Sequence, residues 1–189
     1  MELDLKELSI ELIKISAIAS QKIMEVYNKS SIQVRDKEDG SPVSEADLIS
    51  HKIINDRLFS LLRDVPILSE EDSSNDNNDS SLFWLVDPLD GTKEFISKNG
   101  EFTVNIALIN EGIPILGIVE APALGVSFLG IKGEGSFRLK KDNKIKINTS
   151  PMTKELCRIV VSRSHQSKED SRLIKEAGRN FKKVKILKA

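Results

Sequence analysis

The chain has little of what marks a disulfide-stabilised, secreted or membrane-spanning protein. Its 189 residues include one cysteine, Cys157, so no internal disulfide can form. The N-terminus reads Met-Glu-Leu-Asp, without the basic and then apolar segments of a signal peptide. No apolar run approaches the roughly 20 residues that a bilayer-spanning helix needs. We therefore expect a cytoplasmic protein, and this composition is also compatible with peripheral association with the inner membrane.

The chain also lacks an excess of charge of either sign. Its 28 lysine and arginine residues almost balance 29 aspartate and glutamate residues, for a formal net charge of −1. Proteins that bind DNA or RNA usually present a strongly positive surface to the phosphate backbone. We therefore expect no nucleic acid polymer as a partner, and a small molecule as the substrate.

Hydrophobic periodicity predicts two helices followed by a strand-rich stretch. Apolar residues recur every three or four positions over residues 4–28, which predicts an amphipathic helix. A second helix is predicted to begin near Ser44, with apolar residues on its buried side: Ile49, Ile53, Ile54, Leu58 and Leu61. The polar stretch 70–81 is typical of a surface loop. Beyond it strands are predicted, with a turn at 133–136, over residues 82–87, 102–109, 115–120, 125–131 and 144–148.

Near residue 150 the pattern changes to an alternation of strand and helix. A strand is predicted at 158–162, a helix at 168–177 and another strand at 184–187. This order is typical of an α/β subdomain. We therefore predict one subdomain over residues 1–150 and the beginning of a second over residues 151–189.

The most informative stretch is Trp84–Phe95, which reads Trp-Leu-Val-Asp-Pro-Leu-Asp-Gly-Thr-Lys-Glu-Phe. It places two carboxylates, Asp87 and Asp90, at the end of a buried strand. The proline between them fixes φ and removes a backbone donor, and the following glycine lets main-chain amides come close to an anion. Such a group suits the binding of hard divalent cations against a phosphate. Because Asp, Pro and Gly are also common turn residues, a simple chain reversal is the alternative interpretation.

Several motifs together resemble the inositol monophosphatase superfamily. They are the segments 67–71, 87–95 and 99–108. Within the superfamily, the form Asp-Pro-Leu-Asp-Gly-Thr-Lys-Glu-Phe is similar to the CysQ-type 3'(2'),5'-bisphosphate nucleotidases, as are Gly40–Asp47 and Ser162–His165. The resemblance implies an α/β fold, the layered α/β/α/β/α sandwich, here with its second subdomain incomplete.

The resemblance also implies a metal site. Its ligands are Glu70, Asp87, Asp90 and the backbone carbonyl of Leu89, binding two or more Mg²⁺ ions, and inhibition by Li⁺ is expected. Between Glu70 and its neighbour Glu71, the family register selects Glu70. Three converging carboxylates repel one another, so we expect at least one to stay protonated without cations.

Two further residues, Asp47 and Thr92, are implied to orient the attacking water. Ser44-Glu45-Ala46-Asp47 is also typical of a helix capping box, in which Asp47 bonds back to the helix start. The two interpretations of Asp47 are compatible, because a capped helix end holds a side chain in place.

The implied substrate site combines the motif with a second loop. Its phosphate part consists of Glu70, Leu89, Asp90, Gly91 and Thr92, with the amides of Gly91 and Thr92 around the phosphate. In the nucleotidase branch the Ser-Arg-Ser-His loop lines the nucleotide pocket, which makes Ser162 and His165 candidates for contacts to adenosine. A lone histidine such as His165 is more commonly a polar surface residue.

The resemblance predicts a phosphoric monoester hydrolase that removes the 3'-phosphate of adenosine 3',5'-bisphosphate (PAP) to give AMP, a reaction linked to sulfur assimilation. One alternative is an inositol monophosphatase-type sugar phosphatase. The family's later Trp-Asp-x-x-Ala-Gly motif, which supplies another metal-ligating Asp, is absent from these 189 residues. An inactive truncated fragment that binds metal is therefore another alternative. We also expect that an incompletely covered second subdomain could form a homodimer.

Overall fold

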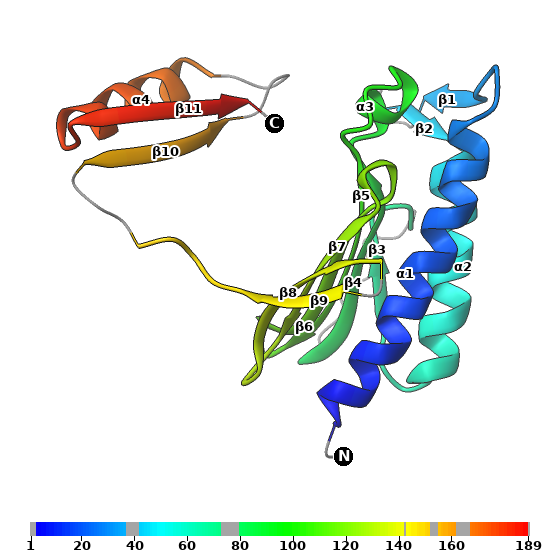
Figure 1. Ribbon diagram of the computed structural model, residues 1–189. Helices are drawn as coiled ribbons and strands as arrows, with labels where there is room; N and C mark the ends of the chain where they lie inside the picture. The colour runs from blue at the N-terminus through cyan, green and yellow to red at the C-terminus, as the bar shows by residue number, and fades with distance from the viewer. Residues whose placement is uncertain are drawn as a thin grey trace. The chain divides into compact units, whose positions relative to one another are not determined.

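The first part of the chain, Met1–Ile147, combines two long helices with one sheet (Figure 1). The computed structural model describes residues 3–36, 42–72, 80–141, 143–151, 155–161 and 167–188. The elements of this unit, in chain order, are α1 (Leu5–Tyr27), β1 (Val34–Asp36), β2 (Pro42–Ser44), α2 (Glu45–Leu61), β3 (Ile67–Ser69), β4 (Leu82–Asp90), α3 (Thr92–Ile96), β5 (Thr103–Asn110), β6 (Ile113–Ala121), the short 3₁₀ helix Pro122–Leu124, β7 (Val126–Ile131), β8 (Gly135–Lys140) and β9 (Asn143–Ile147).

The seven strands of the sheet follow the chain order from β3 to β9. All neighbouring strands are antiparallel except β3 and β4, which are parallel. Parallel neighbours end at the same edge of a sheet. The residue after β3, Glu70, therefore emerges beside the end of β4, and its amide donates to the carbonyl of Val86 at 3.0 Å.

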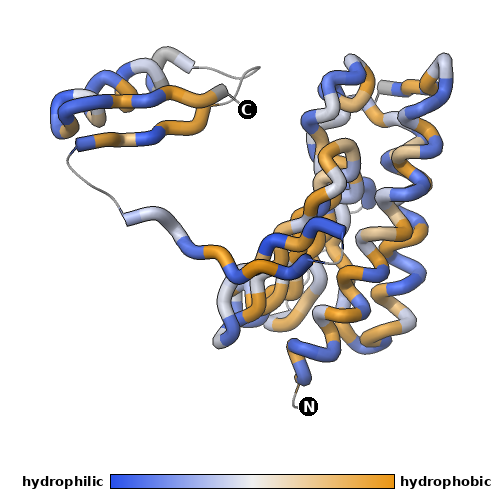
Figure 2. The backbone as a smooth tube through the Cα atoms, in the orientation of Figure 1, coloured by the Kyte–Doolittle hydropathy of each residue, from blue (hydrophilic) through white to orange (hydrophobic). Residues whose placement is uncertain are grey.

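The two helices cover one face of the sheet, side by side (Figure 1). α1 begins at Asp4, whose carboxylate accepts hydrogen bonds from the amides of Lys6 and Glu7. Its apolar residues recur at helical spacing, as the colours along the tube show (Figure 2), and those facing the sheet are buried. Each large aliphatic side chain buried in this way contributes about 1.5–3 kcal/mol. The central side chains of this core are Leu12, Ile23, Trp84, Ile106, Leu108 and Ile118.

The opposite face of the sheet is more open. Side chains alternate between the two faces along each strand. Leu85, Val119 and Phe128 accordingly remain 49%, 41% and 41% exposed. Asp87 and Asn105 lie on this same open face, directly opposite each other on β4 and β5, and Val119 is the next partner on β6.

The structure confirms the helices and strands predicted for this unit. It also requires three corrections, of which two are strands that were not predicted and one is the buried side of α2. The helix predicted over 4–28 is α1, and Trp84, at the start of the motif, is fully buried. The sequence pattern missed the short pair β1 and β2, and also β8, where only Phe137 and Leu139 face the core in an otherwise exposed strand.

The third correction concerns the buried side of α2. Ile49 was predicted to be buried, but it is 36% exposed, and the first turns of the helix bury Asp47 and Ser50 instead. Apolar periodicity cannot find a buried face whose residues are polar. These two side chains face β4 and the turn after it, as the contacts below show.

The second unit, Asn148–Ala189, is a small strand–helix–strand. It contains β10 (Leu156–Val161), α4 (Lys168–Arg179) and β11 (Lys183–Lys188), and the two strands pair in parallel. The division of the chain thus falls between residues 147 and 148. Several apolar side chains of this unit are exposed: Val160, Leu173, Ile186 and Leu187. In the described part of the whole chain, no helix is both long and apolar enough to cross a membrane.

Glu120 on β6 is a carboxylate on the buried face of the sheet, where its charge is expected to lower stability. It lies opposite the fully buried Val104, and its carboxylate accepts a hydrogen bond from the Ser127 hydroxyl. Burial raises the pKa of Glu120 above its usual value of 4.5, and the bond from Ser127 partly opposes this effect. Because the folded-state pKa lies above the unfolded one, the charged carboxylate lowers stability as the pH rises from about 4.5 through the folded-state pKa.

Replacing Glu120 with glutamine is therefore expected to raise the melting temperature at pH 7, by about 2 °C. Glutamine keeps an oxygen acceptor for Ser127 but carries no charge. The gain should disappear below pH 4.5, where the carboxyl group is protonated in the wild type. Thermal melts across this pH range measure the effect, with Glu111→Gln on an exposed turn as the control. An unchanged melting temperature at pH 7 contradicts the prediction.

Candidate metal and phosphate site

Asp87 and Asp90 lie at the end of β4, where its pairing with β5 becomes irregular. The register between the two strands shifts between these residues. The intervening Pro88 is buried, and its carbonyl accepts a hydrogen bond of 2.8 Å from the buried hydroxyl of Ser50 on α2. α2 therefore holds the main chain between the two carboxylates, and the simple chain reversal considered from the sequence is excluded because the motif continues a nine-residue strand.

The electrostatics of Asp87 show that negative charge is crowded here. Burial, followed by the charges of Glu70 and Asp90, raises the pKa of Asp87 from 3.8 to about 7. A hydrogen bond with the Glu70 carboxyl acts in the same direction, and one with the Leu89 backbone opposes it. In addition, Oδ1 of Asp87 is buried without a hydrogen-bond partner. A buried carboxylate oxygen without a partner is costly, and a cation bound to it would remove that cost.

The carboxylates of Glu70, Asp87 and Asp90 are not arranged as a coordination shell in this structure. Within the described residues, no group of three or more His, Cys, Asp or Glu side chains is arranged as a metal cluster. Glu70 and Asp90 nevertheless act on Asp87 strongly enough to shift its pKa. The two findings are consistent, because like charges repel one another and a cation bound between the carboxylates would offset that repulsion. The donors are all hard oxygens, which fits Mg²⁺.

Asn105 is a polar residue of this site that the sequence analysis missed. Its Nδ2 donates to Oδ2 of Asp90 at 3.2 Å, and its Oδ1 is buried without a partner. It lies directly opposite Asp87 on the neighbouring strand. The signal in the sequence was an amide in the interior of the largely apolar strand Thr103–Asn110, and the strand pairing places it directly opposite Asp87. Asn105 therefore holds one carboxylate in place beside the other.

Asp47 contacts Thr92 and caps its own helix at the same time. Its Oδ2 accepts from the Ser44 amide at 2.8 Å, and its Oδ1 accepts from the Thr92 hydroxyl at 3.1 Å. The Thr92 hydroxyl also lies 3.3 Å from the carbonyl of Leu89. Asp47 is only 1% exposed. The capping interpretation and the pairing with Thr92 are therefore both correct as statements of contact.

The turn at Gly91 requires glycine. Its φ is +88°, and a Cβ atom would lie 2.9 Å from the carbonyl oxygen of Glu101. α3 begins at the next residue, and its buried Phe95 packs against the rings of Tyr27 and Phe102. The aromatic cluster fixes the short helix, and so fixes the turn that precedes it.

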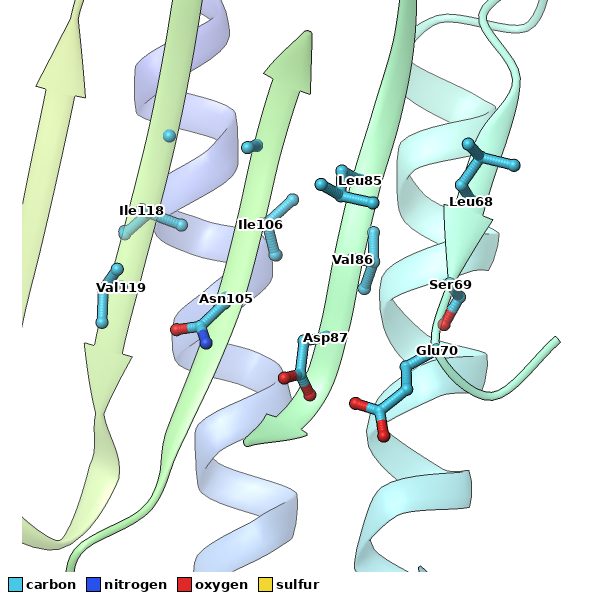
Figure 3. Close-up of a pocket in the computed structure, with 12 residues that line it drawn as sticks. Leu68, Ser69, Glu70, Leu85, Val86, Asp87, Asn105, Ile106, Ile118 and Val119 are labelled. Atoms are coloured by element: carbon cyan, nitrogen blue, oxygen red, sulfur yellow. The ribbon is translucent and has the colours of Figure 1, made fainter. Parts of the chain in front are cut away.

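A pocket of about 500 Å³ opens on the exposed face of the sheet beside these residues (Figure 3). Figure 3 shows Glu70, Asp87 and Asn105 together at one end of it, with Glu70 just after β3 and Asp87 on the neighbouring β4. Apolar side chains such as Leu68 and Leu85 form the rest. Of the residues expected at the substrate site, Ser162 and His165 lie outside the described residues.

Comparison with known proteins identifies the family of the chain. A family model described as the inositol monophosphatase family matches residues 4–187. This chain belongs to that family. The α/β fold implied by the resemblance is confirmed, because the structure of CysQ from Bacteroides thetaiotaomicron, a bacterial member of the inositol monophosphatase family, superposes with a TM-score of 0.84. That match covers 100% of this chain and 74% of the other, at 26% identity.

Curated members of the family are similar in sequence. The 3'(2'),5'-bisphosphate nucleotidase CysQ of Escherichia coli (strain K12) is 42% identical over 166 residues, which is 85% of this chain and 65% of that protein. The enzyme of the same name from Buchnera aphidicola (subsp. Acyrthosiphon pisum) is 42% identical over 146 residues, 76% of this chain and 54% of that protein. The chain thus spans between about half and two thirds of the length of these relatives.

Proposed function

We propose that this chain carries the metal and phosphate site of a Mg²⁺-dependent phosphatase that hydrolyses the 3'-phosphate of PAP to give AMP and phosphate. The observation that carries the proposal is the state of Asp87. Its pKa is raised to about 7 by burial and by two neighbouring carboxylates, and one of its oxygens is buried without a partner. Such a group is costly in a metal-free protein and favourable once a divalent cation neutralises it.

In this proposal Glu70, Asp87, Asp90 and the carbonyl of Leu89 hold the cation. When bound, Mg²⁺ would supply Lewis-acid stabilisation of the phosphoryl oxygens and activation of water, and Li⁺ would inhibit by competing for the same oxygens. Asn105 keeps Asp90 oriented through its bond of 3.2 Å. Further metal ions need ligands beyond these residues.

Thr92 and Asp47 act on the attacking water. The Thr92 hydroxyl donates its hydrogen to Asp47 at 3.1 Å. The lone pairs of the Thr92 oxygen are then available to accept a hydrogen bond from water. Asp47 is held by the helix cap, so the pair is rigid before substrate arrives. Gly91 lets the backbone approach the phosphate, whose oxygens would be met by the amides of Gly91 and Thr92.

The choice of a nucleotide substrate is supported by the similar proteins named 3'(2'),5'-bisphosphate nucleotidase CysQ. It is tested by phosphate release from PAP and from inositol 1-phosphate, each with Mg²⁺ and with EDTA. We expect the 189-residue chain to prefer PAP by at least about tenfold in kcat/KM and to be inactive with EDTA. The E. coli nucleotidase serves as the positive control.

A preference for inositol 1-phosphate would overturn the nucleotidase assignment and keep the metal site. Release of no phosphate from either substrate, with Mg²⁺ binding intact, would identify the chain as a metal-binding fragment that needs further residues for turnover.

A further inference from the structure

The three carboxylates of the proposed metal site differ in how firmly the backbone holds them. Asp87 and Asp90 belong to β4, a nine-residue strand with a partner on each side. Glu70 follows β3, which has three residues and lies at the edge of the sheet. Short edge strands have few hydrogen bonds to fix them. The position of Glu70 therefore depends on the bond from its amide to the carbonyl of Val86 and on the turn that it begins.

That turn is closed by two residues, Ser69 before Glu70 and Asp72 after Glu71. The amide of Ser69 donates to Oδ2 of Asp72 at 3.0 Å, and the amide of Asp72 donates to the carbonyl of Ser69 at 3.1 Å. The Ser69 hydroxyl also accepts from the Glu71 amide at 3.4 Å. Ser69 and Asp72 thus form the base of the turn.

A histidine on α2, far away in the sequence, contacts both of these residues. Nδ1 of His51 lies 2.8 Å from the Ser69 hydroxyl, and its Nε2 lies 3.6 Å from Oδ1 of Asp72. One helical turn further on, Nδ2 of Asn55 lies 3.3 Å from the same Nε2. The ring is therefore held by its own helix on one side and bonded to the base of the turn on the other. Its side chain is 22% exposed, so these contacts compete little with water.

We propose that His51 is a positioning residue for the metal site: through Ser69 and Asp72 it holds Glu70 where its carboxylate can join Asp87 in binding a divalent cation. This inference rests on the proposed function. The same helix also anchors the other side of the site, through the bond from Ser50 to the carbonyl of Pro88. α2 thus fixes the turn of Glu70 and the strand of Asp87 to one rigid element, which sets the spacing between the two carboxylates.

The physical effect is preorganisation. Without His51 the Glu70 turn keeps its own hydrogen bonds but loses its attachment to α2, and binding a cation must then also order the turn. Residues that hold a ligand from outside the coordination shell commonly change metal affinity by about 10–100-fold. Because His51 acts through two intermediates, we expect the lower end of this range.

The test is calorimetric titration of Mg²⁺ into the unmodified chain and into five variants, which needs no turnover. His51→Ala and Ser69→Ala are each expected to weaken Mg²⁺ binding about tenfold. His51→Asn should recover most of the affinity, because the asparagine amide occupies the place of Nδ1 and can still bond Ser69. Lys52→Ala is the matched control, since Lys52 is the next residue on α2 and pairs only loosely, at 3.7 Å, with the exposed Asp56.

The double variant His51→Ala/Ser69→Ala separates positioning from general loss of structure. If the two residues act through one hydrogen bond, the double variant binds Mg²⁺ about as well as the weaker single variant. Independent effects, about a hundredfold in total, would overturn the proposal, as would unchanged affinity in both His51 variants. Failure of the unmodified chain to bind Mg²⁺ would instead overturn the metal site itself and this inference with it. Thermal melts confirm folding, and His51→Asn provides the comparison if His51→Ala does not fold.

Discussion

Replacing Asp87 with asparagine is expected to abolish Mg²⁺ binding and to lower phosphatase activity by about 10³-fold or more. A catalytic cation contributes several kcal/mol of transition-state stabilisation, and each 1.4 kcal/mol is a factor of ten in rate. Asp87 lies between Glu70 and Asp90 in the charge cluster, so its loss removes the central anionic ligand. Titration calorimetry and phosphate release measure the two effects.

The same substitution should make the metal-free protein more stable at pH 8. The folded-state pKa of Asp87 is about 7 and its usual value is 3.8. The unfavourable charge is therefore absent below about pH 4 and fully present above pH 7, so wild-type stability falls as the pH rises through this window. Asparagine carries no charge. In EDTA the melting temperature of the Asp87→Asn variant should therefore exceed that of the wild type at pH 8 and match it near pH 4.

Added Mg²⁺ should reverse the order, because a cation that binds only the folded wild type raises its melting temperature. Asp64→Asn, at an exposed position before β3, is the control and should change neither property. Retention of wild-type Mg²⁺ affinity by Asp87→Asn would remove this residue from the metal site.

Replacing Thr92 with alanine is expected to lower kcat by about 10²–10³-fold while Mg²⁺ affinity stays within about twofold, because this is the size of effect that a group acting on a transferred proton has. The hydroxyl that bonds Asp47 at 3.1 Å is lost, whereas every proposed metal ligand remains. Thr92→Ser should restore most of the activity, since serine keeps the Oγ atom. Steady-state kinetics with parallel Mg²⁺ titrations provide the measurement.

Thr92 is a better test of this pair than Asp47. The Asp47 carboxylate also accepts from the Ser44 amide, so its removal would loosen the start of α2 as well as the water site. A wild-type kcat in the Thr92→Ala variant would exclude Thr92 from the reaction, whatever its contacts. A loss of Mg²⁺ affinity equal to the loss of rate would show that Thr92 instead supports the carbonyl of Leu89, 3.3 Å away.

Local patterns were sufficient for the parts of this protein whose interactions are close in sequence. The periodicity of residues 4–28 predicted α1, and the motif Trp84–Phe95 predicted a strand followed by a turn that needs glycine. The motif also identified the family, because spacing between carboxylates, proline and glycine is a property of the chain itself. β8 was missed since it begins at Gly135, inside the segment 133–136 that was predicted as a turn, and the polar buried face of α2 was missed since hydrophobicity cannot indicate it.

The amino-acid sequence by itself determined which residues have oxygen atoms that can bind a metal, where the main turn lies and which of the long helices and strands form. Only the tertiary structure decided which donors meet. Asp47 reaches Thr92 across 45 positions, His51 reaches Ser69 across 18, and Asn105 reaches Asp90 across 15. The first two pairs are set by the packing of α2 against β3 and β4, and the third by the antiparallel pairing of β4 with β5. The raised pKa of Asp87 has the same origin, because burial and the proximity of separate strands are properties of the folded chain and not of any segment in it.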